Sequence, residues 1–216
     1  MLAARVISVA IGYIFGLFVT GYFIGKTHQV DLRTMGSGNV GATNTMRNLG
    51  AKAGAITLLG DCGKTILAML LIWAIFHGRY PDGIRLLELY AGAGAILGHN
   101  FPITLKFKGG KGVACTAGLI LFFSPIEAPV CILVFVGVVV LSKYVSLASI
   151  LVMVAFVIQT FCFSKAGWLN IGAVQYQKEL YILVLALAGL CIIQHRANIG
   201  RLLHGTENKV TLGKHA

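Results

Sequence analysis

A polar segment near the start of the chain has the composition of an anion-binding loop. It reads GSGNVGATNTMR from Gly36 to Arg47. Glycines let backbone N–H groups approach an anion closely, and hydroxyl, amide and guanidinium groups can complete its hydrogen bonding. We therefore expect this segment to bind phosphate, and the residues that would do so are Ser37, Gly38, Asn39, Gly41, Thr43, Asn44 and Arg47.

Two nucleotide-binding motifs are matched only in part. The letters G-x-G-x-x-G occur from Gly36 to Gly41, but the strand and βαβ unit that this motif requires are missing from the sequence pattern. Lys64 and Thr65 follow a glycine as in a P-loop, but Leu58 occupies the position of the first glycine. The sequence therefore gives no support for a nucleotide-binding fold.

A second polar segment, GHNFP followed by FKGGKG, lies directly before an apolar run. Lysines and glycines at the start of a helix form a natural anion site. An alternative is that the lysines only anchor the chain at a membrane surface. The residues expected to bind substrate here are His99, Lys108, Gly109, Gly110, Lys111 and Gly112.

A third polar segment, HRANIGR, follows the last apolar run. On a helix, His195 and Asn198 are separated by three residues and share a face, so both could serve one site. Asp61 and Lys64 have the same spacing inside an apolar run. Charges within a membrane usually have a function, but here mutual neutralisation is as good an explanation as a role in the site.

The composition indicates that lipid, rather than water, surrounds most of the chain. Hydrophobic residues make up 57% of the 216 residues and charged residues 12%, with a mean hydropathy of +0.83. Soluble proteins carry about a quarter charged residues. We therefore predict one integral membrane domain, 1–216. The net charge of +11 fits the excess of cations on cytoplasmic loops and the binding of anionic substrates, so nucleic acid is not expected.

Apolar runs predict an all-α protein with seven transmembrane helices. A turn at Ser124 and Pro125 favours two short helices over a single long one, which would leave six spans. The five cysteines are scattered without a C-x-x-C pair, so we expect neither a disulfide framework nor a metal site. The predicted helices are 3–25, 53–77, 86–105, 112–124, 126–142, 145–163 and 179–195.

The distribution of charge orients these helices. With seven spans, twelve of the 18 lysines and arginines fall on one side and five on the other, while Lys64 lies within a helix. Because cytoplasmic loops carry the excess of positive charge, the N-terminus is expected outside and the C-terminus in the cytoplasm. This topology places all three polar segments on the cytoplasmic face. Glycines spaced by four residues in the first and third helices predict close helix packing.

The three motifs, in order, resemble those of the bacterial acyl-phosphate:glycerol-3-phosphate acyltransferases, the PlsY family. The resemblance spans the chain and rests on GSGNVGATN with Arg47, on GHN-x-P with FKGGKG, and on HR-x-N-I-x-R-L. It implies transfer of a fatty acyl group from acyl phosphate to the 1-hydroxyl of glycerol 3-phosphate, which gives lysophosphatidic acid. It further implies a bacterial inner-membrane enzyme that needs no metal or other cofactor and no acyl-CoA.

The resemblance also implies roles for single residues. Ser37, Asn39, Thr43 and Asn44 would surround a substrate phosphate, and Arg47 and Lys111 would neutralise phosphate charge. His195 and Asn198 would hold the glycerol part. The expected catalytic residues are therefore Ser37, Arg47, Lys111, His195 and Asn198. Either His195 or a substrate phosphate oxygen would take the hydroxyl proton.

Two other functions remain to be weighed, a carrier for organic anions and a noncatalytic scaffold. A carrier would often show an internal repeat, which is not evident, and a scaffold gives no reason for the polar loops. His77 and Asp82 form the H-x4-D pattern of a different, acyl-CoA-using acyltransferase family. The predicted topology places this pattern on the outside, so we interpret it as a chance match.

Overall fold

The computed structural model describes residues 1–169, 171–172 and 174–210, and no strand occurs within these ranges. The prediction of an all-α fold is therefore confirmed. The α-helices are α1 (Leu2–Gly16), α2 (Thr20–Thr27), α3 (Ala42–Phe76), α4 (Ile84–Asn100), α5 (Val113–Phe123), α6 (Ala128–Ser142), α7 (Val145–Lys165), α8 (Gln177–Gln194) and α9 (Arg196–Leu203).

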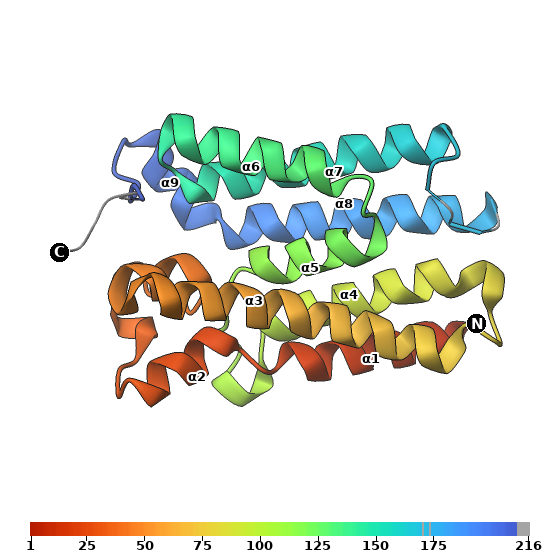
Figure 1. Cartoon of the computed structure of the whole chain (residues 1–216), viewed down its shortest axis with the longest axis horizontal. Helices are drawn as coiled ribbons and strands as arrows, with labels where there is room; N and C mark the ends of the chain where they lie inside the picture. Colours follow the sequence, from red (N-terminus) through yellow and green to blue (C-terminus); the bar gives the residue numbers. More distant parts are fainter. Residues whose placement is uncertain (170, 173, 211–216) are drawn as a thin grey trace.

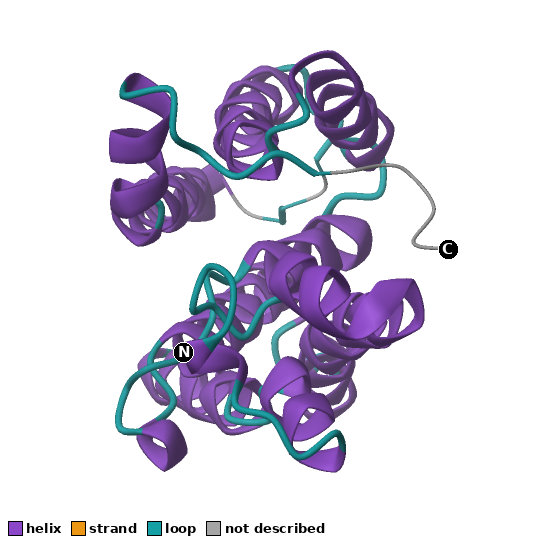
Figure 2. Cartoon of the chain, turned by 90° about the vertical axis from the view of Figure 1, so that its left-hand side faces the viewer, coloured by secondary structure: helices purple, strands orange, loops and turns teal. Residues whose placement is uncertain are grey.

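The helices form two neighbouring groups. One contains α1 to α5, in which α1 packs along α4, and α3 packs on both α4 and α5 (Figure 1). The other contains α6 to α9, in which α7 packs between α6 and α8. Contacts between α4 and α8 join the groups, which are also visible when the bundle is viewed along its length (Figure 2).

The outer surface of the bundle is apolar. Leu133, Leu141 and Ile182 are 71%, 86% and 67% exposed, as expected for side chains that face lipid rather than water. Four stretches are long and apolar enough to cross a membrane: Leu2–Thr27, Ala42–Phe76, Val145–Lys165 and Val174–Gln194. The apolar helices α5 and α6 are shorter, so the count of seven transmembrane helices stays a prediction.

Three predicted helix boundaries are wrong. The run 3–25 is not one helix, because the chain leaves the helix at 17–19 between α1 and α2. The second helix starts at Ala42 instead of residue 53 and includes a kink at Gly50, where φ is +88°. The third ends at Asn100 rather than residue 105. The turn between α5 and α6 is where it was predicted.

Glycines bring α1 and α4 into backbone contact, as their spacing predicted. A Cβ added to Gly12 would lie 2.0 Å from the carbonyl oxygen of Ala91, and one on Gly94 would lie 2.3 Å from that of Val9. Such small residues let helices approach closely when lipid supplies no hydrophobic driving force between them. The α1–α4 contact therefore has no room for a side chain at these positions.

We expect Gly94→Ala to destabilise the protein by about 1–3 kcal/mol, because the new methyl group collides with backbone that cannot move aside cheaply. The matched control is Gly137→Ala in α6, where an added Cβ meets nothing within 4 Å. Thermal unfolding in detergent should show a lower melting temperature for Gly94→Ala alone. Equal melting temperatures for the two variants would contradict this account of the α1–α4 contact.

Candidate active site

A polar cavity of about 140 Å³ lies between the two groups of helices. Segments that are far apart in the sequence meet in its wall, namely the start of α3, the loop before α5, and the junction of α8 and α9. The predicted site residues that line it are Ser37, Asn39, Gly41, Thr43, Asn44, Arg47, His99, Lys111, Gly112, His195 and Asn198. Four others, Gly38, Lys108, Gly109 and Gly110, are not in its wall.

Asn44 organises the first loop from inside. Its side chain is 2% exposed, and its Oδ1 accepts a hydrogen bond from the Ser37 N–H at 2.9 Å. Its Nδ2 donates to the carbonyl oxygens of Leu32, Met35 and Asn39 at 3.2, 3.0 and 2.8 Å. The sequence led us to expect a direct phosphate ligand, but these bonds already occupy the amide. Asn44 therefore shapes the loop.

The other polar groups of this segment remain available to a ligand. Thr43 and Arg47 belong to the first turns of α3 rather than to a loop, and the residue before the helix is Gly41, whose N–H donates to Asn39 Oδ1 at 2.8 Å. Gly41 and Ala42 line the cavity, so the electropositive start of α3 faces it. Together with the guanidinium of Arg47, this helix start can bind an anion.

Gly109 and Gly110 of the second motif pack behind the site, whereas Gly112 lines it. The Gly110 N–H donates to the carbonyl oxygen of His99 at 3.0 Å, and a Cβ on Gly110 would lie 2.1 Å from His99 Nε2. A Cβ on Gly109 would lie 2.0 Å from the same carbonyl oxygen. Lys108 is exposed outside the cavity, so its predicted contact with substrate is not supported by this geometry. The glycines hold the loop that carries Lys111.

His195 is placed to accept a proton. It is 2% exposed, and its Nδ1 lies 2.8 Å from the carbonyl oxygen of Cys191, which can only accept a hydrogen bond. Nδ1 therefore carries a proton, and in the neutral ring Nε2 is an acceptor. Burial lowers the pKa of His195 to about 4, so the ring is neutral at pH 7.

Lys111, Asn198 and Glu207 form a chain along the cavity wall. Lys111 Nζ donates to Asn198 Oδ1, and Asn198 Nδ2 donates to Glu207 Oε1 at 2.9 Å. Glu207 also accepts a hydrogen bond from Arg201 Nε at 2.8 Å. Burial lowers the pKa of Lys111 to about 8, while the negative charge of Glu207 acts in the opposite direction. The side chain of Lys111 is thus held at the cavity with an unusually labile positive charge.

Several residues of the wall were missed by the sequence analysis. Glu207 and Asn208 lie in the polar tail, and a carboxylate following the basic HRANIGR segment was a signal that could have found the first. Ser146 and Ser149 project from α7, and the Ser146 hydroxyl is buried without a hydrogen-bond partner among the described residues. Two small hydroxyls in a membrane helix gave no such signal.

A second, apolar cavity of about 260 Å³ adjoins the polar one. The two share Leu58, Val113, Ala114, Phe135 and Ser149 in their walls. The remainder of the apolar wall comes from α5, α6, α7 and α8. A molecule with an anionic head and an apolar tail would find a suitable environment for each part.

One cluster beside the polar cavity has the donor atoms of a metal site. Ligand atoms of Asp61, His99 and Cys115 all lie within 4.8 Å of one another. The ammonium of Lys64, however, lies 2.9 Å from both Asp61 Oδ1 and His99 Nδ1. A lysine cation is therefore bound where a metal ion would need these two ligands.

The fold and the paired cavities define a class, that of integral membrane proteins with a polar chamber beside an apolar one. A family model described as glycerol-3-phosphate acyltransferase matches residues 6–205. This protein belongs to that family, the PlsY acyltransferases. Membership favours the predicted enzyme over the carrier and the scaffold.

Individual relatives match nearly the full length of the chain. The glycerol-3-phosphate acyltransferase of Chlorobium luteolum is 38% identical over 96% of this chain and 97% of its own. That of Thermoanaerobacter pseudethanolicus is 39% identical over 95% of both chains. The crystal structure of PlsY, an integral membrane glycerol 3-phosphate acyltransferase, in its glycerol 3-phosphate form is 34% identical, with a TM-score of 0.80 over 96% of both chains. Its lysophosphatidic acid form gives a TM-score of 0.78 at 33% identity.

The lowered pKa of Lys111 predicts how anion binding depends on pH. As pH rises through about 8, Lys111 loses its proton and the cavity loses a positive charge. The dissociation constant of sulfate, whose own charge is constant in this range, should then rise by up to about tenfold per pH unit. Titration calorimetry of the purified protein between pH 6.5 and 9.5 would measure this.

The control for that measurement is Lys111→Arg, because a guanidinium stays protonated throughout the range. This variant should bind sulfate with little change between the two ends of the pH series. The same rise in both proteins would show that another group is responsible.

Proposed function

We propose that this protein transfers a fatty acyl group from acyl phosphate to the 1-hydroxyl of glycerol 3-phosphate. The products are lysophosphatidic acid and inorganic phosphate. The observation that carries the proposal is the cavity pair, in which Arg47 and Lys111 face a polar chamber that adjoins an apolar one. The similar PlsY structures are described as a glycerol 3-phosphate form and a lysophosphatidic acid form. These two forms support glycerol 3-phosphate as the acceptor and lysophosphatidic acid as the product.

The charges of the polar chamber suit two phosphate groups. Acyl phosphate and glycerol 3-phosphate repel each other as anions, so cations and N–H donors must offset their charge before the reacting atoms can meet. Arg47, Lys111 and the start of α3 supply this positive potential. The acyl chain would occupy the apolar cavity and place its carbonyl carbon at the boundary between the two chambers.

The reaction proposed is a direct transfer. The hydroxyl oxygen attacks the acyl carbonyl carbon, the bond from that carbon to the phosphate oxygen breaks, and phosphate leaves with the bonding electrons. The hydroxyl proton passes either to His195 Nε2 or to a phosphate oxygen. A serine–histidine–carboxylate triad needs a carboxylate on the second ring nitrogen, whereas His195 Nδ1 faces a backbone carbonyl. Direct attack therefore fits the geometry better than an acyl-enzyme.

The proposed setting is the bacterial inner membrane, with the cavity facing the cytoplasm and the N-terminus outside. The charge asymmetry of the sequence supports this orientation. In this orientation glycerol 3-phosphate enters from the cytoplasm, while acyl phosphate enters sideways from the lipid.

The choice of donor tests the proposed function most directly. Purified protein should form lysophosphatidic acid from acyl phosphate and glycerol 3-phosphate, and EDTA should leave the rate unchanged. Acyl-CoA should not replace acyl phosphate. The readout is radiolabelled glycerol 3-phosphate converted to lipid. Turnover with acyl-CoA as fast as with acyl phosphate would overturn the donor assignment, as would EDTA inhibition reversed by a divalent ion.

Two histidines discriminate between this enzyme and the H-x4-D alternative. His195 lines the polar cavity, whereas His77 follows the C-terminal end of α3, at the opposite end of the bundle from α9 (Figure 1). A proton acceptor must reach the proton directly or through one water. We expect His195→Ala to lower kcat on the order of 10²-fold and His77→Ala to leave it near wild type.

The two variants control for each other, and thermal unfolding in detergent should show that both are folded. The reverse ranking, with His77→Ala inactive and His195→Ala active, would refute the site and the orientation together.

A further inference from the structure

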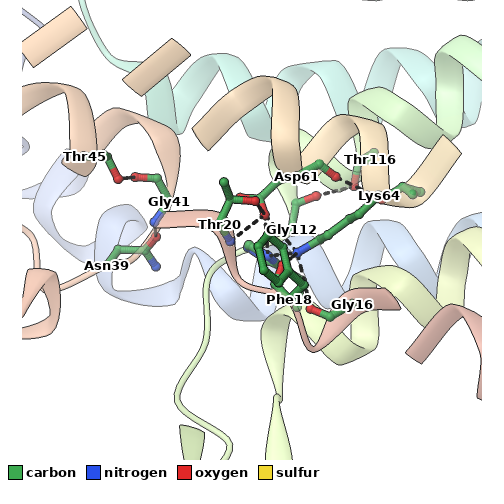
Figure 3. Close-up of polar contacts among 12 residues, drawn as sticks. Gly16, Phe18, Thr20, Asn39, Gly41, Thr45, Asp61, Lys64, Gly112 and Thr116 are labelled. Atoms are coloured by element: carbon green, nitrogen blue, oxygen red, sulfur yellow. Dashed lines mark hydrogen bonds and ion pairs between the residues drawn. The ribbon is translucent and has the colours of Figure 1, made fainter. Parts of the chain in front are cut away.

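Asp61, Lys64 and His99 form a buried polar cluster in the middle of the first group of helices, where they are 1%, 6% and 2% exposed. Lys64 Nζ donates to Asp61 Oδ1 and to His99 Nδ1, each at 2.9 Å. Figure 3 shows Asp61 and Lys64 next to the break between α1 and α2. Mutual neutralisation accounts for the contact between Asp61 and Lys64, but not for the further contacts of these two residues with α1, α2 and α4.

The pair satisfies the backbone groups that the helix break leaves free. Lys64 Nζ donates its third hydrogen bond to the carbonyl oxygen of Phe18 at 2.7 Å and lies 3.3 Å from that of Gly16. Asp61 Oδ1 accepts hydrogen bonds from the N–H and the hydroxyl of Thr20 at 3.2 and 2.9 Å. The cation thus faces the electronegative end of α1 and the carboxylate the electropositive start of α2. The break and the ion pair depend on each other.

The break in turn fixes the position of the first phosphate-binding segment. Past the break, α2 packs against that segment so tightly that a Cβ on Gly21 would lie 2.0 Å from the Val40 carbonyl oxygen and 3.0 Å from Thr45 Oγ1. Val40 and Thr45 flank the residues at the start of α3 that line the polar cavity. A shift of α2 would therefore move the cavity wall.

His99 connects the same pair to the second segment. Because the Lys64 ammonium can only donate, His99 Nδ1 accepts this hydrogen bond, and the ring carries its own proton on Nε2. The ring and carbonyl of His99 pack directly on Gly110, and the next residue is Lys111. The position of Lys64 therefore helps to set the position of Lys111.

We propose that Asp61 and Lys64 are positioning residues for acyl transfer, a single buried ion pair that aligns both phosphate-binding segments, one through α2 and the other through His99. The inference rests on the proposed function for its turnover assay but not for its binding assay. A pair with only a structural role would affect stability and leave the alignment of the site unchanged.

The test replaces the pair by a neutral one, Asp61→Asn with Lys64→Met, so that no unpaired charge is buried. The matched control is Arg5→Met with Glu179→Gln. This removes the ion pair between α1 and α8, in which Arg5 Nε lies 2.5 Å from Glu179 Oε1, near the end of α1 remote from α2 (Figure 1). Each double variant should lose some thermal stability.

Only the variant Asp61→Asn with Lys64→Met should lose catalytic activity and substrate affinity per folded molecule. We expect its kcat to fall on the order of 10²-fold, the scale that small misplacements of catalytic groups produce. Its dissociation constant for glycerol 3-phosphate, measured by calorimetry without a donor, should rise at least about fivefold. The control should stay within about twofold of wild type in both. Lys64→Gln in place of Lys64→Met keeps an N–H donor and should recover part of the activity.

Thr20→Val removes one donor to Asp61 and leaves the pair intact, so it provides a test even if the double variant does not fold. It should lower kcat several-fold in protein that thermal unfolding shows to be folded at the assay temperature. Wild-type kcat and glycerol 3-phosphate affinity in Thr20→Val and in the folded pair variants would overturn the proposal. If wild-type protein binds glycerol 3-phosphate but does not use acyl phosphate, the donor assignment fails while the binding comparison still decides the role of the pair.

Discussion

The need to satisfy every backbone polar group inside a lipid-facing bundle governs this structure. An unpaired N–H or carbonyl group in hydrocarbon costs several kcal/mol, so irregular backbone at membrane depth occurs only where protein groups can bond to it. The chain between α1 and α2 meets this condition through Asp61 and Lys64. The same break lets α2 turn toward the start of α3, and the polar cavity lies beside that contact.

The site is both positively charged and partly buried, and burial disfavours the charged form of a lysine. Burial strengthens the attraction between Lys111 and a phosphate group, but it also lowers the pKa of the free lysine to about 8. Glu207 moderates this loss, and through Asn198 it also holds the lysine in place. In the proposed anion-binding site this carboxylate is explained by its effect on the free protein, because it is the counter-ion of Lys111 and Arg201 among the described residues.

The boundary between the polar and the apolar cavity suits a molecule that has an anionic head and an apolar tail. Phe135 and Ser149 belong to both walls and come from α6 and α7, whereas the cations come from the first group of helices and its loops. The site is therefore complete only when the two groups pack together. The first group of helices supplies the glycine-rich segments of the polar wall, and the second supplies His195 and much of the apolar wall.

The sequence by itself determined the helical fold, the membrane setting and half of the residues that line the polar cavity. Long apolar runs satisfy their backbone within lipid as helices, and glycine-rich polar segments between such runs have the groups that can bind anions. Both signals are local. They located Ser37, Arg47, Lys111 and His195 in the cavity wall without any knowledge of the packing.

Only the tertiary structure decided which polar groups face the cavity. The break at 17–19 lies within the apolar residues Leu-Phe-Val, and Asp61 and Lys64 reach its free backbone groups from another helix. Asn44 and Lys108 both belong to glycine-rich motifs, but the Asn44 amide bonds to its own loop and Lys108 is exposed outside the cavity. Glu207, from the C-terminal tail, lines the cavity. The sequence shows which chemical groups a side chain carries. The direction in which that side chain points depends on contacts between residues far apart in the sequence.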